Sequence, residues 1–273
     1  MQVETDKIVA NFSRDGFYFP IGVLGKREVN SVRSQIEFVE EKYGKTYNLE
    51  DIFRGHAHLV MPVLYDLARH PIITDAVTHL LGPDLLVWNT SIFIKEPKTE
   101  TFVGLHQDLY YWGLDSNEEV TAWVAITPAT LENGCMEFVA GSHKTAVPHF
   151  DTCNKNNLLS RRQELKARVK EKDIINVQLK AGQCSLHHGY TFHSSPPNRS
   201  EDRRIGFAIR YITPRMRQTQ FSHDFAILAC GQDKHRNFRL LPRPRGIFAK
   251  EEVKRTKAIH EIQNTIYMRD FDP

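Results

Sequence analysis

The chain has 273 residues, of which 41% are hydrophobic and 25% charged, and its formal net charge is +3 at pH 7. This balanced charge gives no broad basic field of the kind that binds nucleic acid. No apolar run approaches the roughly 18 residues of a membrane span, and residues 1–16 lack the apolar core of a secretory signal. The four cysteines have no CxxC spacing, so we expect neither a zinc site nor a disulfide framework. We therefore expect a cytoplasmic protein whose partners are neither membranes nor nucleic acids.

Residues 1–82 are mostly helical by pattern. Residues 26–43 place apolar side chains at three- and four-residue steps, and Gly44 then marks a typical helix end. The apolar positions are Val29, Val32, Ile36 and Val39. Residues 58–81 predict one or two further helices with an interruption near Pro71, because proline breaks the helical hydrogen-bond pattern. We expect the helix over residues 26–43 to cover a β barrel.

Residues 84–213 contain a dense series of expected strands. They fall at 84–95, 102–109, 120–127, 136–139, 174–179, 183–187 and 203–213. Short strands separated by glycine and proline turns favour a sandwich or a jelly roll. We therefore predict a mainly β fold with flanking helices, namely a double-stranded β-helix of the jelly-roll or cupin type.

Two segments differ in character from the expected strands. Residues 145–172 are polar and highly charged, and we predict a helix over 164–172 within them. Long insertions in compact domains are often functional, so this segment is a candidate lid. Residues 214–273 form a C-terminal extension, in which a helix at about 250–265 is expected to pack on the sheet. A chain of this length suits one domain over residues 1–273.

The most informative short pattern is the triplet His-Gln-Asp at residues 106–108. If residues 105–109 form a strand, His106 and Asp108 point to the same side, because side chains alternate along a strand. Two histidines and one carboxylate on one face are typical of non-haem iron sites, which keep other positions open for a co-substrate and oxygen. An isolated triplet of this kind also arises by chance, so a third ligand is required.

That third ligand is expected on a neighbouring strand. Residues 182–200 run into 203–211, and the two segments suggest a hairpin whose first arm carries the ligand. The candidates on this arm are His187, His188 and His193. His187 and His193 would share a face of an unbroken strand, so alternation alone does not choose between them.

Further motifs surround these histidines. They are residues 106–108, 122–123, 132–136 and 141–144, together with the spacing of His193, Ser195, Asn198 and Arg204. With these motifs the chain resembles the phytanoyl-CoA dioxygenase family of Fe(II)/2-oxoglutarate oxygenases, from residue 12 to about residue 213. The resemblance implies catalytic iron bound by His106, Asp108 and His193, with 2-oxoglutarate and O2 as co-substrates. It leaves His187 and His188 as structural or supporting residues.

The resemblance also implies where 2-oxoglutarate binds. Ser195 and Arg204 would hold its far carboxylate, Trp123 would form a wall beside it, and Gln107 is assigned to the same site. Arginine suits this task because its planar guanidinium pairs with a carboxylate through two hydrogen bonds and stays charged when buried. On a strand, small residues would separate Arg204 from Arg210 on one face and leave room for ligands. The alternative is that both arginines make surface ion pairs.

The implied reaction is hydroxylation, because relatives that halogenate have a small residue in place of Asp108. Within the family, the runs at residues 88–89, 94–97 and 106–114 look most like those of bacterial enzymes that hydroxylate the α-carbon of 2-aminoethylphosphonate, including its N-trimethyl form. We therefore expect a small-molecule substrate.

Six residues are candidates for binding that substrate. A phosphonate needs several donors, and a cationic amine suits aromatic faces. The donors would be Asn89, Lys95 and Arg210, and the aromatic faces Tyr110, Tyr111 and Trp112. Alternatively, the aromatic residues pack the core and the lysine is solvated. Two other functions stay open: the same chemistry on an amino acid, an osmolyte or a secondary metabolite, and a non-catalytic cupin-like binding module.

Overall fold

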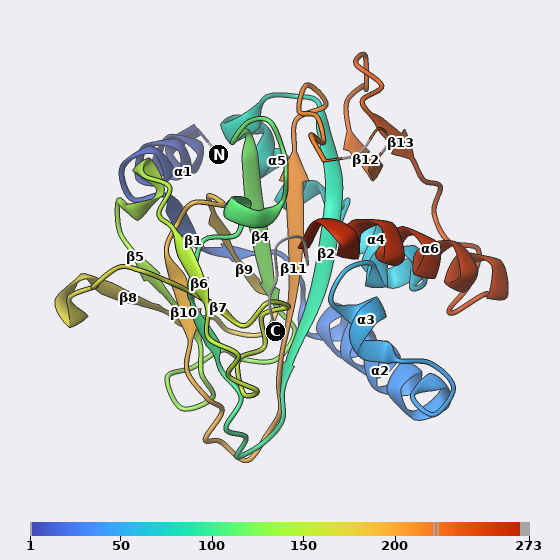
Figure 1. Cartoon of the computed structure of the whole chain (residues 1–273), viewed down its shortest axis with the longest axis horizontal. Coiled ribbons are helices and arrows are strands. Elements are labelled where there is room, and N and C mark those ends of the chain that lie inside the picture. The colour runs from blue at the N-terminus through green and yellow to red at the C-terminus, as the bar shows by residue number, and fades with distance from the viewer. Residues whose placement is uncertain (1, 221, 223, 268–273) are drawn as a thin grey trace.

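The computed structural model describes residues 2–220, 222 and 224–267, and it has two facing β-sheets with helices beside them (Figure 1). The larger sheet has the strand order β1-β9-β4-β11-β2-β12-β13, and the smaller sheet has the order β3-β10-β5-β8. In both sheets, strands that are distant in sequence are hydrogen-bonded neighbours, as expected for a jelly roll. The predicted fold class is therefore confirmed.

The larger sheet consists of β1 (Phe17–Gly22), β9 (Gln183–His187), β4 (Glu119–Ala125), β11 (Arg204–Ile212), β2 (Leu85–Lys95), β12 (Asp224–Cys230) and β13 (Phe238–Leu240). The smaller sheet consists of β3 (Val103–His106), β10 (His193–Ser195), β5 (Met136–Val139) and β8 (Ile174–Val177), and a separate pair is formed by β6 (His149–Asp151) and β7 (Gln163–Leu165). The helices are α1 (Gln2–Asp15), α2 (Lys26–Tyr43), α3 (Leu49–Phe53), α4 (Pro62–Leu67), α5 (Pro71–Leu81) and α6 (Lys250–Tyr267). Short 3-10 turns are η1 (Ala57–Leu59), η2 (Leu109–Tyr111), η3 (Ser142–Lys144) and η4 (Glu171–Asp173).

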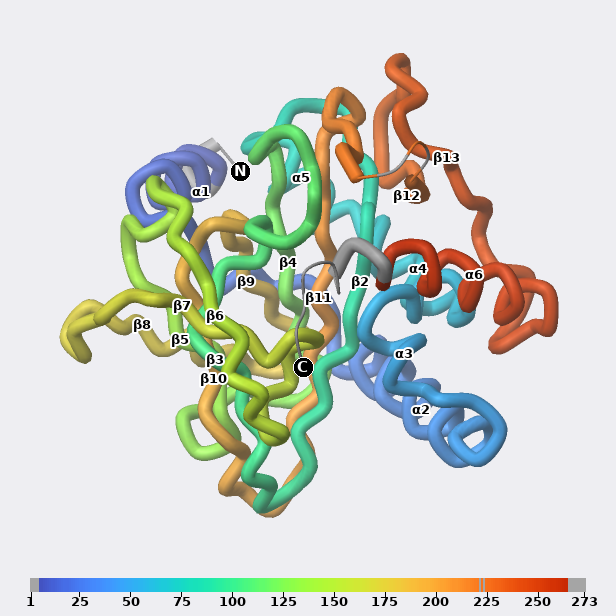
Figure 2. The backbone as a smooth tube through the Cα atoms, in the orientation of Figure 1, coloured from blue at the N-terminus to red at the C-terminus, as the bar shows by residue number. Residues whose placement is uncertain are grey.

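The two faces of the larger sheet pack against different layers, as the course of the chain in Figure 2 shows. Alternate residues of β11 are buried with the helices; they are Ile205, Phe207, Ile209 and Tyr211. On the opposite face, Ala208 and Trp123 share a second core with Phe138 of the smaller sheet. Because strand side chains alternate, the polar residues of β11 also face the smaller sheet. The space between the two sheets is therefore where a site can form, and the helices support it from behind.

The helical predictions are largely confirmed. Helix α2 covers the predicted residues 26–43, and its four predicted apolar side chains are buried. Pro71 begins α5, where its missing N–H is not needed. Helix α6 forms as expected and packs most closely on α3 and η1, and its Gln263 donates a 2.7 Å hydrogen bond to Asp224 of β12 in the larger sheet. Among the described residues, no helix combines the length and apolar character needed to span a membrane.

Three local predictions were wrong. The expected strand 102–109 ends at His106, where the chain turns into η2. The expected helix 164–172 is absent from the described structure, because residues 163–165 pair with β6 and only a 3-10 turn follows. The expected hairpin over 182–211 does not form, because β9 and β11 flank β4 in the larger sheet while β10 lies in the smaller one.

Candidate active site

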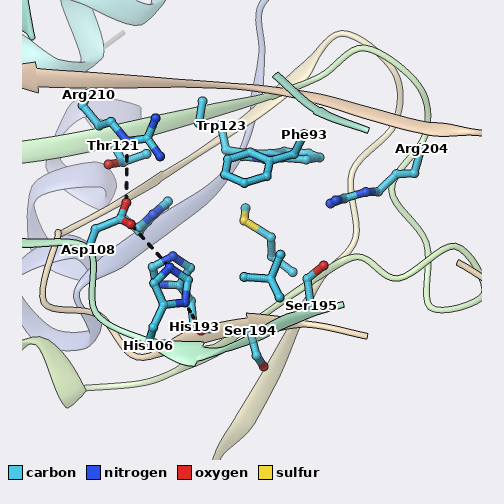
Figure 3. A pocket seen from close by; sticks show the side chains of 14 residues that line it. Phe93, His106, Asp108, Thr121, Trp123, His193, Ser194, Ser195, Arg204 and Arg210 are labelled. Carbon is cyan, nitrogen blue, oxygen red and sulfur yellow. Dashed lines mark hydrogen bonds and ion pairs between the residues drawn. The ribbon is translucent and has the colours of Figure 1, made fainter. Parts of the chain in front are cut away.

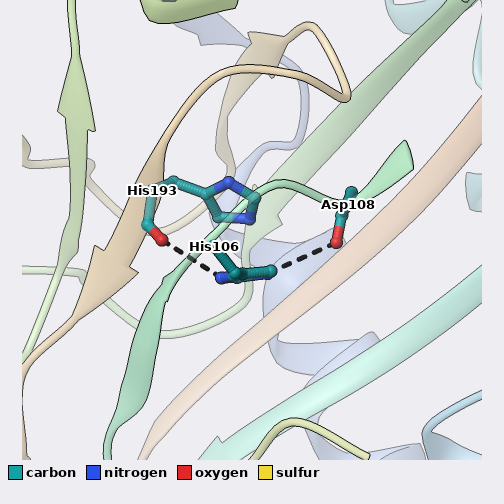
Figure 4. Close-up of side chains that lie close together, drawn as sticks. All are labelled: His106, Asp108 and His193. Atoms are coloured by element: carbon teal, nitrogen blue, oxygen red, sulfur yellow. Dashed lines mark hydrogen bonds and ion pairs between the residues drawn. The ribbon is translucent and has the colours of Figure 1, made fainter. Parts of the chain in front are cut away.

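Three potential metal ligands meet between the sheets (Figure 4). One ligand atom from each of His106, Asp108 and His193 lies within 4.8 Å of the other two. His106 ends β3 and faces His193 of β10 directly across the antiparallel pair, with a ring-centroid distance of 3.9 Å. The sheet pairing therefore brings together two histidines that are 87 residues apart in sequence.

Asp108 reaches the cluster by a different route from the one predicted. Its backbone is helical, with φ −67° and ψ −53°, because the strand has already ended. The turn places Asp108 Oδ1 3.4 Å from His106 Nε2. The prediction that both side chains face the same space was correct, but alternation along a strand was the wrong reason.

Backbone carbonyls fix the orientation of both imidazole rings. His106 Nδ1 lies 2.8 Å from the carbonyl oxygen of Gly104, and His193 Nδ1 lies 2.9 Å from that of Thr191. These carbonyls accept a hydrogen bond from Nδ1–H, which leaves each Nε2 with a lone pair for a metal. The Nε2 nitrogens and the carboxylate are therefore prearranged for a cation such as Fe(II).

The charge states of Asp108 and His193 fit this role. Burial alone would raise the pKa of Asp108, but Arg210 and the two histidines hold it well below its ordinary value. Burial, reinforced by neighbouring His106, holds the pKa of His193 well below its ordinary value. A metal binds ionised carboxylate and neutral imidazole, so no proton needs to leave these two groups near neutral pH.

Arg204 lies at the other end of the same cavity (Figure 3). Its side chain is 1% exposed, and its Nε has no hydrogen-bond partner in the described structure. The guanidinium lies 5.2 Å from the ring centroid of Trp123, and no carboxylate among the described residues pairs with it. Burial lowers the pKa of Arg204 to about 10, which keeps it charged. A buried cation without a counter-ion is costly, so this position fits the carboxylate of a ligand.

Lys95 lies beside Arg204 and lines neither this cavity nor the one on the other side of Asp108, which differs from its predicted place at the substrate. It is fully buried on β2, directly opposite Arg204 in the strand pairing. Its Nζ donates to the carbonyl oxygen of Ser195 at 2.9 Å, and it also contacts the Ser195 hydroxyl and the carbonyl of Pro196. Burial and the neighbouring guanidinium lower the pKa of Lys95 to about 6. The alternative of a solvated lysine is also wrong.

Two further residues were predicted at the 2-oxoglutarate site. Trp123 lines the cavity between the metal ligands and Arg204, where a Cβ atom at Gly206 would overlap its ring. The prediction for Gln107 was wrong. Its side chain donates to the carbonyls of Thr145 and Tyr190 and does not line the cavity. Gln107 instead ties the start of the insertion to the core, where its side-chain oxygen also accepts a hydrogen bond from the backbone N–H of Val147.

His187 remains close to the metal ligands without joining them. Its ring lies 4.9 Å from that of His193 and lines the same cavity. Neither ring nitrogen has a hydrogen-bond partner in the described structure. Burial lowers the pKa of His187 to about 3, so it is a neutral side chain that helps to form the wall.

A second cavity opens on the other side of Asp108. Asn89 and Arg210 line it, as predicted for substrate residues, and so do Tyr111 and Trp112. Arg210 lies 3.8 Å from Asp108 and donates to Ser91 Oγ at 2.7 Å. Arg210 also lines the first cavity, so the two spaces meet at this guanidinium. This second cavity is a candidate chamber for a substrate next to the metal.

Two arginines of the second cavity were not predicted from the sequence, and one tyrosine lies elsewhere than predicted. Arg54 follows α3, and Arg161 lies in the charged insertion; neither has a motif that identifies it. Tyr110 is 42% exposed, packs on His149 and lines neither cavity. It turns outward because residues 109–111 form a 3-10 turn instead of a strand.

The faces of the remaining two aromatic residues are already occupied. Arg161 lies over the Tyr111 ring at 4.8 Å from its centroid, and Arg210 lies over the Trp112 ring at 5.6 Å. A substrate ammonium would have to displace a guanidinium to bind there. These rings therefore position arginines and do not form an open cage for a cationic amine.

A jelly roll that places two histidines, a carboxylate and a buried, unpaired arginine around one cavity has the architecture of the Fe(II)/2-oxoglutarate oxygenases. The site residues fit both groups, since the triad suits Fe(II) and Arg204 suits a carboxylate. The family model for phytanoyl-CoA dioxygenase (PhyH) matches residues 12–206, and the chain belongs to this family.

Individual relatives agree with this assignment. A probable phytanoyl-CoA dioxygenase of Caenorhabditis elegans is 26% identical over 158 residues, which cover 55% of this chain and 51% of that protein. A probable alpha-ketoglutarate-dependent hypophosphite dioxygenase of Stutzerimonas stutzeri is 28% identical over 207 residues, covering 74% of this chain and 70% of that protein. A solved non-heme monooxygenase, ThoJ in its apo form, is 32% identical with a TM-score of 0.83 and covers 94% of this chain and 99% of its own. The chain spans about half the length of the first two curated relatives it matches.

Proposed function

We propose that this protein is an Fe(II)/2-oxoglutarate-dependent oxygenase that hydroxylates a C–H bond of a small polar substrate. The observation that carries the proposal is the meeting of His106, Asp108 and His193 in a cavity whose other end holds the unpaired Arg204. A non-catalytic cupin-like module has no need for all four. When bound, iron and 2-oxoglutarate supply the oxidising chemistry, in which O2 is consumed, carbon dioxide and succinate are released, and C–H becomes C–OH.

The chain's own residues would hold and orient the reactants. His106, Asp108 and His193 would hold the metal, and Arg204 with Ser195 would bind the far carboxylate of the co-substrate. Trp123 walls that half of the cavity and excludes water. Asp108 occupies the position where halogenating relatives have a small residue, which favours hydroxylation as the outcome.

For the substrate we propose 2-aminoethylphosphonate or its N-trimethyl form, with the phosphonate in the second cavity near Asn89 and Arg210. The anionic end is supported by the arginines of this cavity and by a relative that is described as acting on hypophosphite, another phosphorus oxyanion. The amine end has weaker support, because guanidinium groups cover Tyr111 and Trp112. An amino acid, an osmolyte or a secondary metabolite is the competing substrate class.

We also propose that the protein works in the cytoplasm, where thiols stay reduced. All four cysteines are free of disulfide bonds, and two of them, Cys135 and Cys184, are buried as ordinary core residues.

Succinate formation tests both levels of the proposal. The protein would be incubated with Fe(II), 2-oxoglutarate and O2 together with each phosphonate, a set of free amino acids or glycine betaine. We expect succinate and hydroxylated product in equal amounts with one of the phosphonates. Product only from the other compounds overturns the substrate proposal, whereas failure to bind Fe(II) overturns the oxygenase proposal.

A further inference from the structure

The second cavity is lined by three arginines that come from three distant parts of the chain. Arg54 follows α3 in the helical flank, Arg161 belongs to the insertion before β7, and Arg210 is on β11 of the larger sheet. Their side chains are 25%, 10% and 9% exposed, respectively. Three cations from separate elements therefore converge on one small, partly buried space.

Each guanidinium is held in place by neighbours. Arg54 Nη2 pairs with Glu50 at 2.7 Å, and its Nη1 contacts the carbonyl of Leu158 in the insertion. Arg161 Nη2 pairs with Asp151 at 2.8 Å while its guanidinium stacks on Tyr111. Side chains that are already ordered lose little conformational entropy when a ligand binds, so the arrangement is preorganised.

Arg210 is held from the sheet. Its Nη1 donates to Ser91 Oγ at 2.7 Å and to Asn89 Oδ1 at 3.3 Å. Because these are neutral partners and its nearest carboxylate is Asp108 at 3.8 Å, the charge of Arg210 is only loosely compensated. A metal ion bound to Asp108 would neutralise this carboxylate. The guanidinium of Arg210 could then pair with another anion.

The charges that line the cavity do not cancel. Asp108 is the one carboxylate among the described lining residues, and it belongs to the metal centre. Glu50 and Asp151, which anchor Arg54 and Arg161, lie outside the lining, and Glu50 is 63% exposed. Three guanidinium groups thus line a partly buried space whose one described lining carboxylate belongs to the metal centre, and a lining of this sign attracts anions. Each planar fork can donate two parallel hydrogen bonds to an oxyanion.

We infer that Arg54 and Arg161, together with Arg210, form a subsite for a doubly charged phosphorus oxyanion, and that the first two are specificity-determining residues supplied by the flank and the insertion. The inference rests on the proposed function for the identity of the reacting metal, and it adds where the anionic group of the substrate sits. A tetrahedral group held here places the adjoining carbon toward Asp108 and the metal. The insertion thus contributes recognition, since Arg161 and its neighbours form one wall.

Binding measurements on the full chain test this subsite without turnover. The protein would be loaded with Ni(II), which does not support the reaction, and with 2-oxoglutarate, and then titrated with inorganic phosphate, methylphosphonate or acetate. We expect the two phosphorus oxyanions to bind, and acetate, a monoanion, to bind at least tenfold more weakly. We expect Arg54→Gln and Arg161→Gln each to weaken phosphonate binding at least tenfold while changing 2-oxoglutarate affinity less than twofold.

Arg168→Gln is the matched control, because it removes one exposed positive charge from the same insertion without touching the cavity. Unchanged phosphonate affinity in both test variants, or equal loss in the control, would overturn the subsite, as would equal binding of acetate. Failure of the subsite is distinguishable from failure of the proposed function. If the protein turns over a phosphonate and neither Arg54→Gln nor Arg161→Gln changes the rate, only the proposed subsite is rejected. If phosphonate binding depends on the arginines but no phosphonate is turned over, only the proposed substrate is rejected.

Discussion

The two halves of the candidate site are built in different ways. In the half around His193 and Arg204, both residues lie on paired strands. The register of the pairing fixes the position of each side chain relative to its neighbours. The half around Arg54 and Arg161 is supplied by the end of a short helix and by an irregular insertion. Two of the three candidate metal ligands and Arg204 thus come from strands, whereas Arg54 and Arg161 come from segments between regular elements, where residues that bind substrates are often found.

The largest difference between the halves should appear when a metal ligand is removed. We expect Asp108→Ala or His193→Ala to reduce metal affinity and turnover by more than the roughly 10–100-fold that the loss of an outer residue costs. The fold should persist, because the sheets and the helical core do not depend on these side chains. Titration with Fe(II) and thermal unfolding would measure the two effects.

Asp173→Ala is the control for this experiment, since it removes an exposed carboxylate from η4 of the insertion. It should bind metal as the wild type does. Full turnover in either ligand variant would reject the metal assignment. The part of the site around His193 and Arg204 would then not be the metal centre.

The next effect in size concerns the co-substrate. We expect Arg204→Gln to weaken 2-oxoglutarate binding about 100-fold, equivalent to about 3 kcal/mol, because it truncates one partner of a buried charge pair. The neighbouring Arg203 pairs with Glu40 and Glu96 on the other face of the sheet, so Arg203→Gln should change this affinity less than twofold. Isothermal titration calorimetry of the metal-loaded protein with 2-oxoglutarate would check both values. Equal losses in the two variants would show that general charge, rather than the position of Arg204, governs binding.

The same contrast explains how much could be predicted from the sequence. His106 was predictable from a short local pattern, whereas His193 and Arg204 were assigned through the resemblance to the family, because alternation alone did not choose between His187 and His193. The strands at 136–139 and 183–187 and the helix at 26–43 were placed correctly because apolar side chains recur in each at the step of the predicted element. Local periodicity was sufficient wherever local geometry decides the contact.

Prediction was wrong where tertiary contacts decide. Nothing local indicates that Arg54 and Arg161 meet, since they are 107 positions apart and neither is in a regular strand. The expected helix over 164–172 does not form, because its first residues pair with β6 as part of β7. Lys95 was correctly predicted to lie on a strand. Only the pairing of β2 with β11 shows that it lies beside Arg204.

Lys95 offers a smaller and pH-dependent test of the strand-borne half. Its pKa of about 6 means that it is mostly neutral at pH 7.5 when no ligand is present. A carboxylate bound at Arg204 would raise that pKa, so binding of 2-oxoglutarate should take up as much as one proton. Because protons are taken up, the affinity should fall as the pH rises above 6, by at most tenfold per pH unit, until the pKa of the bound state is passed.

Calorimetry in two buffers of different ionisation enthalpy would measure this proton uptake. In the metal-loaded protein the titration of the ligand histidines is suppressed, so the signal reports on Lys95. Lys95→Met should abolish the buffer dependence while keeping the packing of the side chain. An unchanged buffer dependence in this variant would assign the proton to another group.

The smallest effects should separate two adjacent tyrosines in the loop-borne half. The ring of Tyr111 contacts the guanidinium of Arg161. The ring of Tyr110 packs on His149 outside the cavity. We expect Tyr111→Ala to raise the substrate KM about two- to fivefold, the equivalent of one lost cation–π contact of roughly 0.5–1 kcal/mol. Tyr110→Ala should change it less than twofold, and Tyr111→Phe should behave as the wild type because the ring is kept. If Tyr110→Ala had the larger effect, the strand geometry expected from the sequence would be correct at this point, and the 3-10 turn after Asp108 would not be the arrangement that binds substrate.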